Sequence, residues 1–194
     1  MTLLFVIGPP AVGKMTVGNA IAARTGFRVF HNHLAIEPAL RFFEFGTPPF
    51  QRIVDGFRMS VLEEVAASDL PGLVFTFVWA FGHPGDAAVV DAYGKPFERR
   101  GRRVLYLELE ASQQARLERN VGEDRLAEKA SKRDLAGSRA RLIRDDETYQ
   151  LNSTNEFEGR DDHLRVDNTN RSPDEVAELA IRHFGLTRTT PRQS

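Results

Sequence analysis

Near its amino terminus the chain carries a glycine-framed turn between an apolar run and a helical pattern. The turn is Gly8-Pro9-Pro10-Ala11-Val12-Gly13-Lys14, and it directly follows the run Leu3-Leu4-Phe5-Val6-Ile7. A strand, then G-x-x-x-x-G-K, then a helix is the arrangement of a phosphate-binding P-loop. In that arrangement backbone N–H groups and the lysine ammonium surround a polyphosphate. The sequence therefore predicts a polyphosphate site beside the opening strand.

The residues after the turn support this interpretation. Val17, Ala20 and Ile21 follow the lysine at helical spacing, and Gly26 stands where a glycine commonly ends a helix. A purely structural glycine turn is the alternative. The strand before the motif and the helix after it favour the P-loop.

Composition limits the class of protein. The 194 residues fit one α/β domain, and 41% hydrophobic with 27% charged residues is typical of a globular chain. Cysteine is absent, which excludes disulfides, thiol nucleophiles and cysteine-ligated zinc and is compatible with a reducing cytoplasm. We therefore expect a cytoplasmic protein.

Membrane and nucleic-acid partners are not indicated. The apolar start is short, lacks a basic segment and runs directly into the P-loop, so we do not expect a signal peptide. No stretch reaches transmembrane length. The formal net charge of −1 gives no overall attraction to nucleic acid or anionic lipid, although residues 99–144 hold 13 of the 26 Lys and Arg.

Strands and helices are expected to alternate along the chain. The further strands are predicted at 27–31, 73–81, 103–109 and 164–167, with 73–81 as a central strand because it is almost continuously apolar. Helices are predicted at 33–45, 50–67, 86–99, from the cap Ser112 to Val121, from the capping box Ser131–Asp134 to Tyr149, and from Ser172 to Gly185. Residues 122–130 are expected as a surface excursion, 152–161 as a polar loop and 187–194 as a disordered tail.

The helix at 50–67 carries two kinds of side chain. Apolar residues recur at helical spacing and are expected to face inward: Ile53, Val54, Phe57, Val61 and Val65. Arg52, Asp55 and Arg58 are expected to point elsewhere on this helix.

Alternation of strands and helices predicts a parallel, doubly wound sheet with helices on both faces. Ligands of such sheets bind at the carboxyl ends of the strands. Those ends carry the P-loop, His31-Asn32-His33, Phe81-Gly82-His83, Glu110 and Asn168-Thr169-Asn170. These residues form the candidate site.

The P-loop and this order of elements resemble the small P-loop kinases of the shikimate kinase, nucleoside monophosphate kinase and antibiotic phosphotransferase type. The resemblance covers residues 1–186 as one domain. It implies a three-layer α/β/α fold with a five-stranded parallel sheet. It also implies a helical insert for the acceptor at about 34–67 and a lid over ATP at about 119–133.

The resemblance also implies roles for particular residues, with ATP and Mg²⁺ as cofactors. The triphosphate cradle corresponds to Gly8, Pro9, Ala11, Val12, Gly13, Lys14, Met15 and Thr16. Arg119 resembles the arginine that lies over adenine, and Asn168 and Thr169 lie in the adenine-side loop. Arg125 and Arg133 resemble lid arginines that stabilise the charge of the migrating phosphoryl group; solvated helix-surface arginines are the alternative.

The sequence departs from the pattern of these kinases at two positions that usually hold Mg²⁺. Met15 replaces the hydroxyl residue that usually follows the P-loop lysine and binds Mg²⁺, and Thr16 is turned by about 100° from that position. The run Val78-Trp79-Ala80-Phe81 offers no acidic residue, so Asp86 is the nearest candidate. Nucleotide oxygens and water can hold Mg²⁺ with few protein ligands.

The acceptor side is less constrained. Asn32 and His33 are the expected acceptor contacts, with His33 as general base. A zinc site on His31 and His33 is an alternative, but it lacks an evident third ligand; His83 is distant in the sequence. Arg52 and Arg58 either clamp an anionic acceptor or lie on the helix surface. The phenylalanines Phe42, Phe43, Phe45, Phe50 and Phe57 either pack the core or line an acceptor pocket.

The sequence thus favours an ATP-dependent phosphotransferase acting on a metabolite, nucleoside, nucleotide or antibiotic, as a monomer or homodimer. An ATP-binding regulator without phosphotransfer is the alternative, favoured by Met15 and the missing acid. A GTPase is less favoured because the chain has no N-K-x-D motif. Action on polynucleotide ends is disfavoured by the near-neutral net charge.

Overall fold

The computed structural model describes residues 1–120 and 135–189. Its strands are β1 (Thr2–Ile7), β2 (Arg28–His31), β3 (Gly72–Thr76), β4 (Arg103–Glu110) and β5 (His163–Asp167). Its helices are α1 (Lys14–Thr25), α2 (His33–Leu40), α3 (Pro48–Ala67), α4 (Pro84–Glu98), α5 (Gln113–Asn120), α7 (Leu135–Thr148) and α8 (Pro173–Phe184). The predicted excursion at 122–130, the capping box at 131–134 and most of the predicted lid lie outside the described residues.

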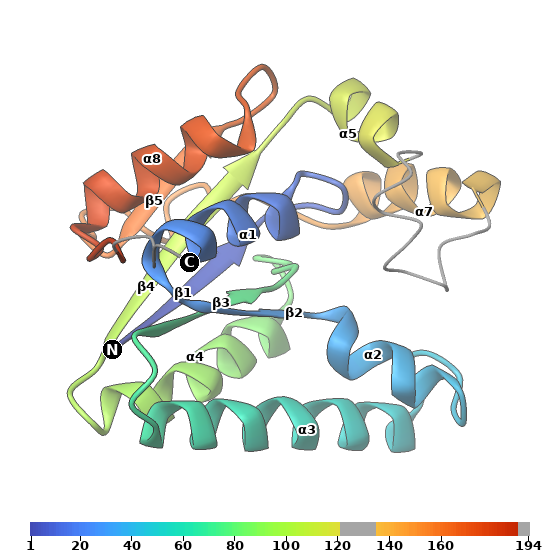
Figure 1. Cartoon of the computed structure of the whole chain (residues 1–194). Helices are drawn as coiled ribbons and strands as arrows, with labels where there is room; N and C mark the ends of the chain where they lie inside the picture. Colours follow the sequence, from blue (N-terminus) through green and yellow to red (C-terminus); the bar gives the residue numbers. More distant parts are fainter. Residues whose placement is uncertain (121–134, 190–194) are drawn as a thin grey trace, which may run out of the picture.

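Within the described residues the strands form one parallel sheet in the order β2-β3-β1-β4-β5 (Figure 1). Helices α1 and α8 cover one face, and α3 and α4 cover the other, which gives three layers. The parallel, doubly wound α/β fold predicted from the sequence is confirmed. All carboxyl ends of the strands consequently meet at one edge.

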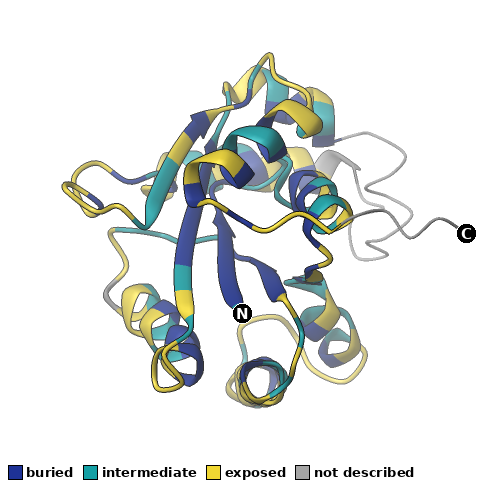
Figure 2. Ribbon diagram, turned by 60° about the vertical axis from the view of Figure 1, so that its left-hand side comes forward, coloured by how far each residue is buried: buried dark blue, intermediate teal, exposed yellow. Residues whose placement is uncertain are grey.

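The position of β1 explains its composition. Its six residues are all buried, and their side chains alternate between the two cores: Leu3, Phe5 and Ile7 toward α3 and α4, Leu4 and Val6 toward α1 and α8. Buried strands of this kind stand out in Figure 2. A strand covered on both faces needs a continuous apolar run, so β1 is the central strand of the sheet.

The predicted strand 73–81 is shorter than expected, and it is not the middle strand. β3 ends at Thr76, and after Phe77 N–H donates to Val6 O (3.0 Å) the chain leaves the sheet. Phe81 N–H then donates to Gln150 O at 2.9 Å, and the ring of Trp79 stacks on that of Phe81. The apolar residues after Thr76 therefore belong to an aromatic cluster beside the sheet.

The helices of the predicted insert also differ from expectation. α2 ends at Leu40 rather than Phe45, and its interior Pro38 has no N–H for the helical ladder. Phe42 and Phe45 are 77% and 66% exposed.

The buried face of α3 is only partly the predicted one: Val54 is buried, and Val61 and Val65 pack against the core as predicted. The residues buried on α3 are Phe50, Val54, Arg58, Leu62 and Ala66, while Ile53 and Phe57 are 54% and 48% exposed. The sequence offers two overlapping apolar stripes on this helix, and packing selected the i, i+4 stripe that includes Arg58. The expectation that Arg58 points away from the interior was wrong: Arg58 is buried, and its terminal nitrogens donate to Asn32, Asp55 and Tyr93, while Nε has no hydrogen-bond partner among the described residues.

The residues predicted to cap the N-termini of α5 and α8 do so in the structure. Ser112 Oγ accepts from Ala115 N–H at 3.2 Å, and Ser172 with Glu175 forms the full capping box of α8. Beyond α8, Thr189 N–H donates to Arg24 O at 3.0 Å; residues 190–194 of the expected tail lie outside the description. In the described part, no helix is both long and apolar enough to cross a bilayer.

Candidate functional site

The P-loop backbone takes a conformation that its glycines permit. Gly8 and Gly13 have φ of 131° and 105°, and Ala11 has φ of 63°, all in the region that L side chains rarely adopt. A Cβ on Gly8 would also overlap the backbone carbonyl of Leu109 on β4. The first glycine is therefore required by both conformation and space.

Side chains bind the carbonyl groups of this loop. Lys14 Nζ donates to Gly8 O at 2.6 Å and to Pro9 O at 2.7 Å. Asn168 Nδ2, which is buried, donates to Val12 O at 2.8 Å. Because side chains engage these carbonyls, the loop is compatible with the phosphate site lined by N–H groups that the motif predicts.

The predicted base-side residues lie together. Arg119, in the last turn of α5, donates to Asn168 O at 2.8 Å, to Thr169 O at 3.0 Å and to Val12 O at 3.3 Å. A Cβ on Gly13 would lie 3.3 Å from Asn168 Nδ2. The structure thus joins residues from α5, the loop after β5 and the P-loop at one place.

Arg116 is a residue that sequence reasoning missed. It is 5% exposed, and its guanidinium donates to both carboxylate oxygens of Asp146 on α7 (3.0 and 2.6 Å). It also donates to Ala111 O at 3.2 Å and reaches Pro10 O of the P-loop at 3.5 Å. In the sequence it resembles the other arginines of the basic segment, so no local signal marked it.

The predicted metal ligands have other environments. Met15 is partly buried and Thr16 is exposed. Asp86 Oδ2 accepts from Ala80 N–H at 3.0 Å, and Asp86 Oδ1 lies 3.4 Å from His83 Nδ1. Among the described residues no three His, Cys, Asp or Glu side chains cluster closely enough to hold a metal ion, so the histidine zinc alternative gains no support.

A polar network links β2, α3 and α4 on the acceptor side. Arg58 donates to Asn32 Oδ1, to Asp55 Oδ1 (3.2 Å) and to the hydroxyl oxygen of Tyr93 (3.4 Å). Tyr93 donates to Asp55 at 3.0 Å, and burial raises the pKa of Tyr93 to about 12 although Arg58 opposes this shift. Two predicted acceptor residues, Asn32 and Arg58, therefore meet, whereas Arg52 is exposed on α3.

His33 lies at a cavity with a carboxylate that the sequence analysis did not select. His33 Nδ1 is 3.2 Å from Glu37 Oε1, one helical turn along α2. The cavity has a volume of about 430 Å³ and is lined by His31, His33, Leu34, Glu37 and Pro38. A histidine oriented by a carboxylate is an arrangement suited to proton transfer.

Glu108 is a second missed acidic residue. It is fully buried on β4, in register with Ile7, the residue before the P-loop. Its carboxylate accepts from Asn152 Nδ2 (2.8 Å), Ser153 Oγ (2.6 Å) and Ser153 N–H (2.8 Å) and lies 2.9 Å from His163 Nε2. Burial alone would raise the pKa of Glu108, but these hydrogen bonds outweigh it and hold the pKa at about 2. The carboxylate fastens residues 152–153 beside the P-loop strand.

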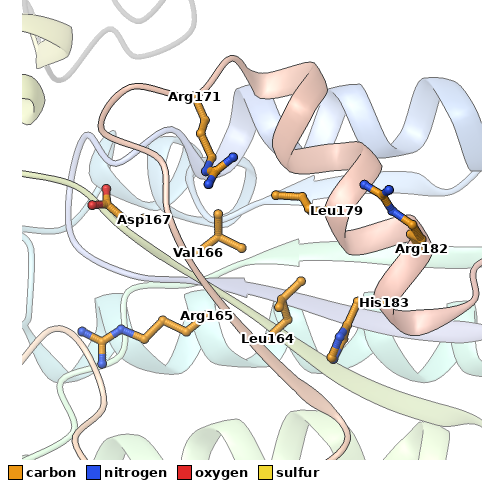
Figure 3. Close-up of a pocket in the computed structure, with 8 residues that line it drawn as sticks. All are labelled: Leu164, Arg165, Val166, Asp167, Arg171, Leu179, Arg182 and His183. Atoms are coloured by element: carbon orange, nitrogen blue, oxygen red, sulfur yellow. The ribbon is translucent and has the colours of Figure 1, made fainter.

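A second cavity, of about 410 Å³, lies between β5 and α8 (Figure 3). Its lining comprises Leu164, Arg165, Val166, Asp167, Arg171, Leu179, Arg182 and His183. Asp167 and Arg171 belong to the segment 167–173 that was predicted as the adenine-side loop, and the other lining residues were not predicted as site residues. Arg165 points away from the other labelled side chains and pairs with Glu110. The predicted lid residues Arg125 and Arg133 lie outside the described part of the chain.

Solved structures with a similar fold include small-molecule kinases and a resistance protein. A sugar kinase from a Janibacter species matches with a TM-score of 0.59 and 14% identity over 96% of each chain. A gluconokinase from Sinorhizobium meliloti matches with a TM-score of 0.58 and 15% identity, covering 95% of this chain and 91% of the other. The tunicamycin resistance protein of Deinococcus radiodurans matches with a TM-score of 0.56 and 17% identity, over 98% and 100%.

The chain has the fold of small-molecule kinases. No protein-family model matches the sequence, and no curated protein matches it. The similarity to these structures is therefore a similarity of fold, and an activity has to be inferred from the residues of the site.

Proposed function

We propose that this protein is an ATP-dependent phosphotransferase acting on a small-molecule acceptor. The observation that carries the proposal is the P-loop itself. Its glycines have positive φ, its carbonyls accept hydrogen bonds from Lys14 and Asn168, and its lysine lies at the start of α1. These features fit a triphosphate better than any other common ligand.

The residues present fit ATP, because the loop has positive φ at Gly8 and Gly13 and its carbonyls are engaged by Lys14 and Asn168. The loop amides and Lys14 would hold the phosphates. Arg119, Asn168 and Thr169 would meet the base, and we retain Arg125 and Arg133 as proposed lid arginines. When bound, ATP supplies the phosphoryl group; Mg²⁺ would be held by nucleotide oxygens and water, with Thr16 the nearest hydroxyl.

The acceptor would bind at the end of β2. Arg58 donates a hydrogen bond to the side-chain oxygen of Asn32, which fixes the orientation of the amide. The amide nitrogen can then donate to an oxygen of the acceptor substrate. His33 would take the proton of the attacking hydroxyl, with Glu37 orienting the ring. The names of the sugar kinase and the gluconokinase support a hydroxyl-bearing acceptor. We propose that this chemistry takes place in the cytoplasm, in a monomer or homodimer.

Incubation of the protein with γ-labelled ATP, Mg²⁺ and a panel of alcohols, sugars, nucleosides and aminoglycosides tests the proposal. We expect label on at least one acceptor, lost in His33→Ala and kept in the control His183→Ala. The control histidine is exposed on α8. A folded protein that binds no nucleoside triphosphate in calorimetry would contradict the proposal.

A regulator that binds ATP without transferring phosphate is the second candidate. Met15 favours it, because a thioether is a poor Mg²⁺ ligand. The bond from Ala80 N–H to Asp86 also favours it, because it engages the nearest acidic residue. Tight ATP binding with no labelled product across the panel would select this candidate.

A further inference from the structure

Exposed apolar side chains are concentrated in one part of the described chain. The large hydrophobic residues with high exposure are Leu34, Phe42, Phe43, Phe45, Ile53, Phe57 and Tyr149. All but Tyr149 lie between residues 34 and 57, in α2, α3 and the loop that joins them. Large apolar side chains gathered on one surface mark a binding site more often than a solvated face.

Part of this surface continues directly from the cavity at the end of β2. Leu34 and Pro38 line the cavity and are one turn apart on α2. Leu34 and Pro38, which are spaced by four, share one flank of α2. Phe42 follows the end of α2 at Leu40, in a turn where its N–H donates three residues back to Ala39 O at 3.1 Å, and its side chain is 77% exposed. We call Leu34, Pro38 and Phe42 the apolar strip.

The cavity at the start of the strip is polar on one side. His33 and Glu37 contribute an imidazole and a carboxylate to its lining. Pro38 has no N–H to offer the carbonyl of Leu34, so that carbonyl lacks its usual helical donor. Hydrogen-bond acceptors therefore lie at one end of an otherwise apolar path.

We propose that the acceptor is an amphiphile, whose hydroxyl-bearing end enters the cavity while its alkyl or aryl body lies along the apolar strip. This inference rests on the proposed phosphotransferase function and narrows its substrate class. A small polyol would leave the strip uncovered. A second copy of the chain fits less well, because it would cover the strip without using the polar cavity at its end.

A binding measurement tests the strip apart from catalysis. Titration with the fluorescent dye glucoside 4-methylumbelliferyl β-D-glucoside, which is neutral and has a hydroxyl-bearing end and an aryl body, should show saturable binding, weakened about tenfold in Phe42→Ser and in Leu34→Ser. The matched control is Tyr149→Ser, because Tyr149 and Leu34 are both 46% exposed and Tyr149 lies outside the strip. Unchanged binding by both strip variants, or equal weakening in the control, would overturn the proposal.

Sedimentation of the same variants tests the competing occupant. A wild-type dimer that Phe42→Ser converts to a monomer would show that the strip binds a second copy, and the proposal would be wrong. A monomer with the dye result above supports it.

A kinetic comparison separates this inference from the function on which it rests. Octyl β-D-glucoside below its micelle concentration should exceed methyl β-D-glucoside by about tenfold or more in kcat/KM, because burial of several methylene groups favours the longer acceptor. Phe42→Ser should bring this ratio close to one. Equal use of both glucosides would refute the amphiphile and leave the kinase standing. Absence of ATP binding in calorimetry would instead remove the proposed function.

Discussion

The P-loop side and the insert side of the strand-end edge are built in different ways. On the P-loop side, the backbone passes against Leu109 O, Asn168 is bonded to Val12 O, and Glu108 is fully buried beside β1. On the insert side, Ile53 and Phe57 of α3 are about half exposed. One region has little space for change, whereas the other presents apolar surface to solvent.

Under the proposed function, this contrast reflects different constraints on the two parts of the site. A triphosphate offers the same oxygens in every reaction, so a fixed hollow of amides serves it. Acceptors differ, and the insert provides a surface that can vary without disturbing the sheet. The sharpest tests therefore place matched substitutions on the two sides.

The largest effect is expected at Lys14. Lys14→Ala should lower phosphoryl transfer by about a thousandfold, because under the proposed function it removes the ammonium that stabilises the transferring group. Thermal unfolding should change little, since the side chain is only partly buried. Lys95→Ala, at an exposed ion pair with Asp91, is the control and should retain activity. Equal loss of stability and activity at Lys14 would show a structural lysine.

Glu108 should give a stability difference that depends on pH. Its pKa is about 2 in the folded protein against an ordinary value of 4.5, so its contribution is present above about pH 5 and is lost as the pH falls through 2. Urea unfolding should show Glu108→Gln less stable by about 3 kcal/mol at pH 7, with the difference shrinking toward pH 2. Glu64→Gln, on the exposed face of α3, is the control. A difference in unfolding free energy that does not change with pH would contradict the proposal that the Glu108 carboxylate is ionised in the folded protein.

The same substitution on the two sides should have opposite signs. Gly8→Ala should destabilise the fold by at least about 2 kcal/mol, because it adds a Cβ at φ of 131° against Leu109 O. Gly56→Ala, in open space within α3, should stabilise by about 0.5–1 kcal/mol through the lower chain entropy of alanine. Chemical unfolding of both variants checks this. Stability changes of the same sign in both variants would contradict the contrast between the two regions.

The smallest effect is expected at Met15. Met15→Ser restores a hydroxyl after the P-loop lysine, and the Mg²⁺ concentration for half-maximal activity should fall by a few-fold. Titration of activity with MgCl₂ measures it, and Thr16→Ala should act in the opposite direction if Thr16 contributes. A large loss of activity in Met15→Ser would give the thioether a positive role.

The sequence predicted those features that depend on neighbouring residues. The P-loop is a contiguous motif, and the α8 capping box spans only four residues, Ser172 to Glu175. The β1 run is apolar because both of its faces are covered. Each of these depends on local chemistry that a short window contains.

Buried charges could not be predicted in this way. Arg58 is stabilised by Asn32 and Tyr93, which lie 26 and 35 residues away, and Glu108 by partners more than 40 residues away. A charged residue enters the interior only when such partners meet it, and a single sequence does not show which ones do. For α3, two apolar stripes were compatible with helical spacing, and contacts with α4 and the sheet decided between them.

Asn168 has a further consequence for how a nucleotide is received. One asparagine donates through its amide to the phosphate loop, while its main-chain oxygen accepts from Arg119 at the base side. The phosphate side and the base side of the proposed nucleotide site are thus connected through Asn168. Binding of a nucleotide then costs less free energy for ordering the protein. A triphosphate without a base would still meet a preorganised phosphate loop.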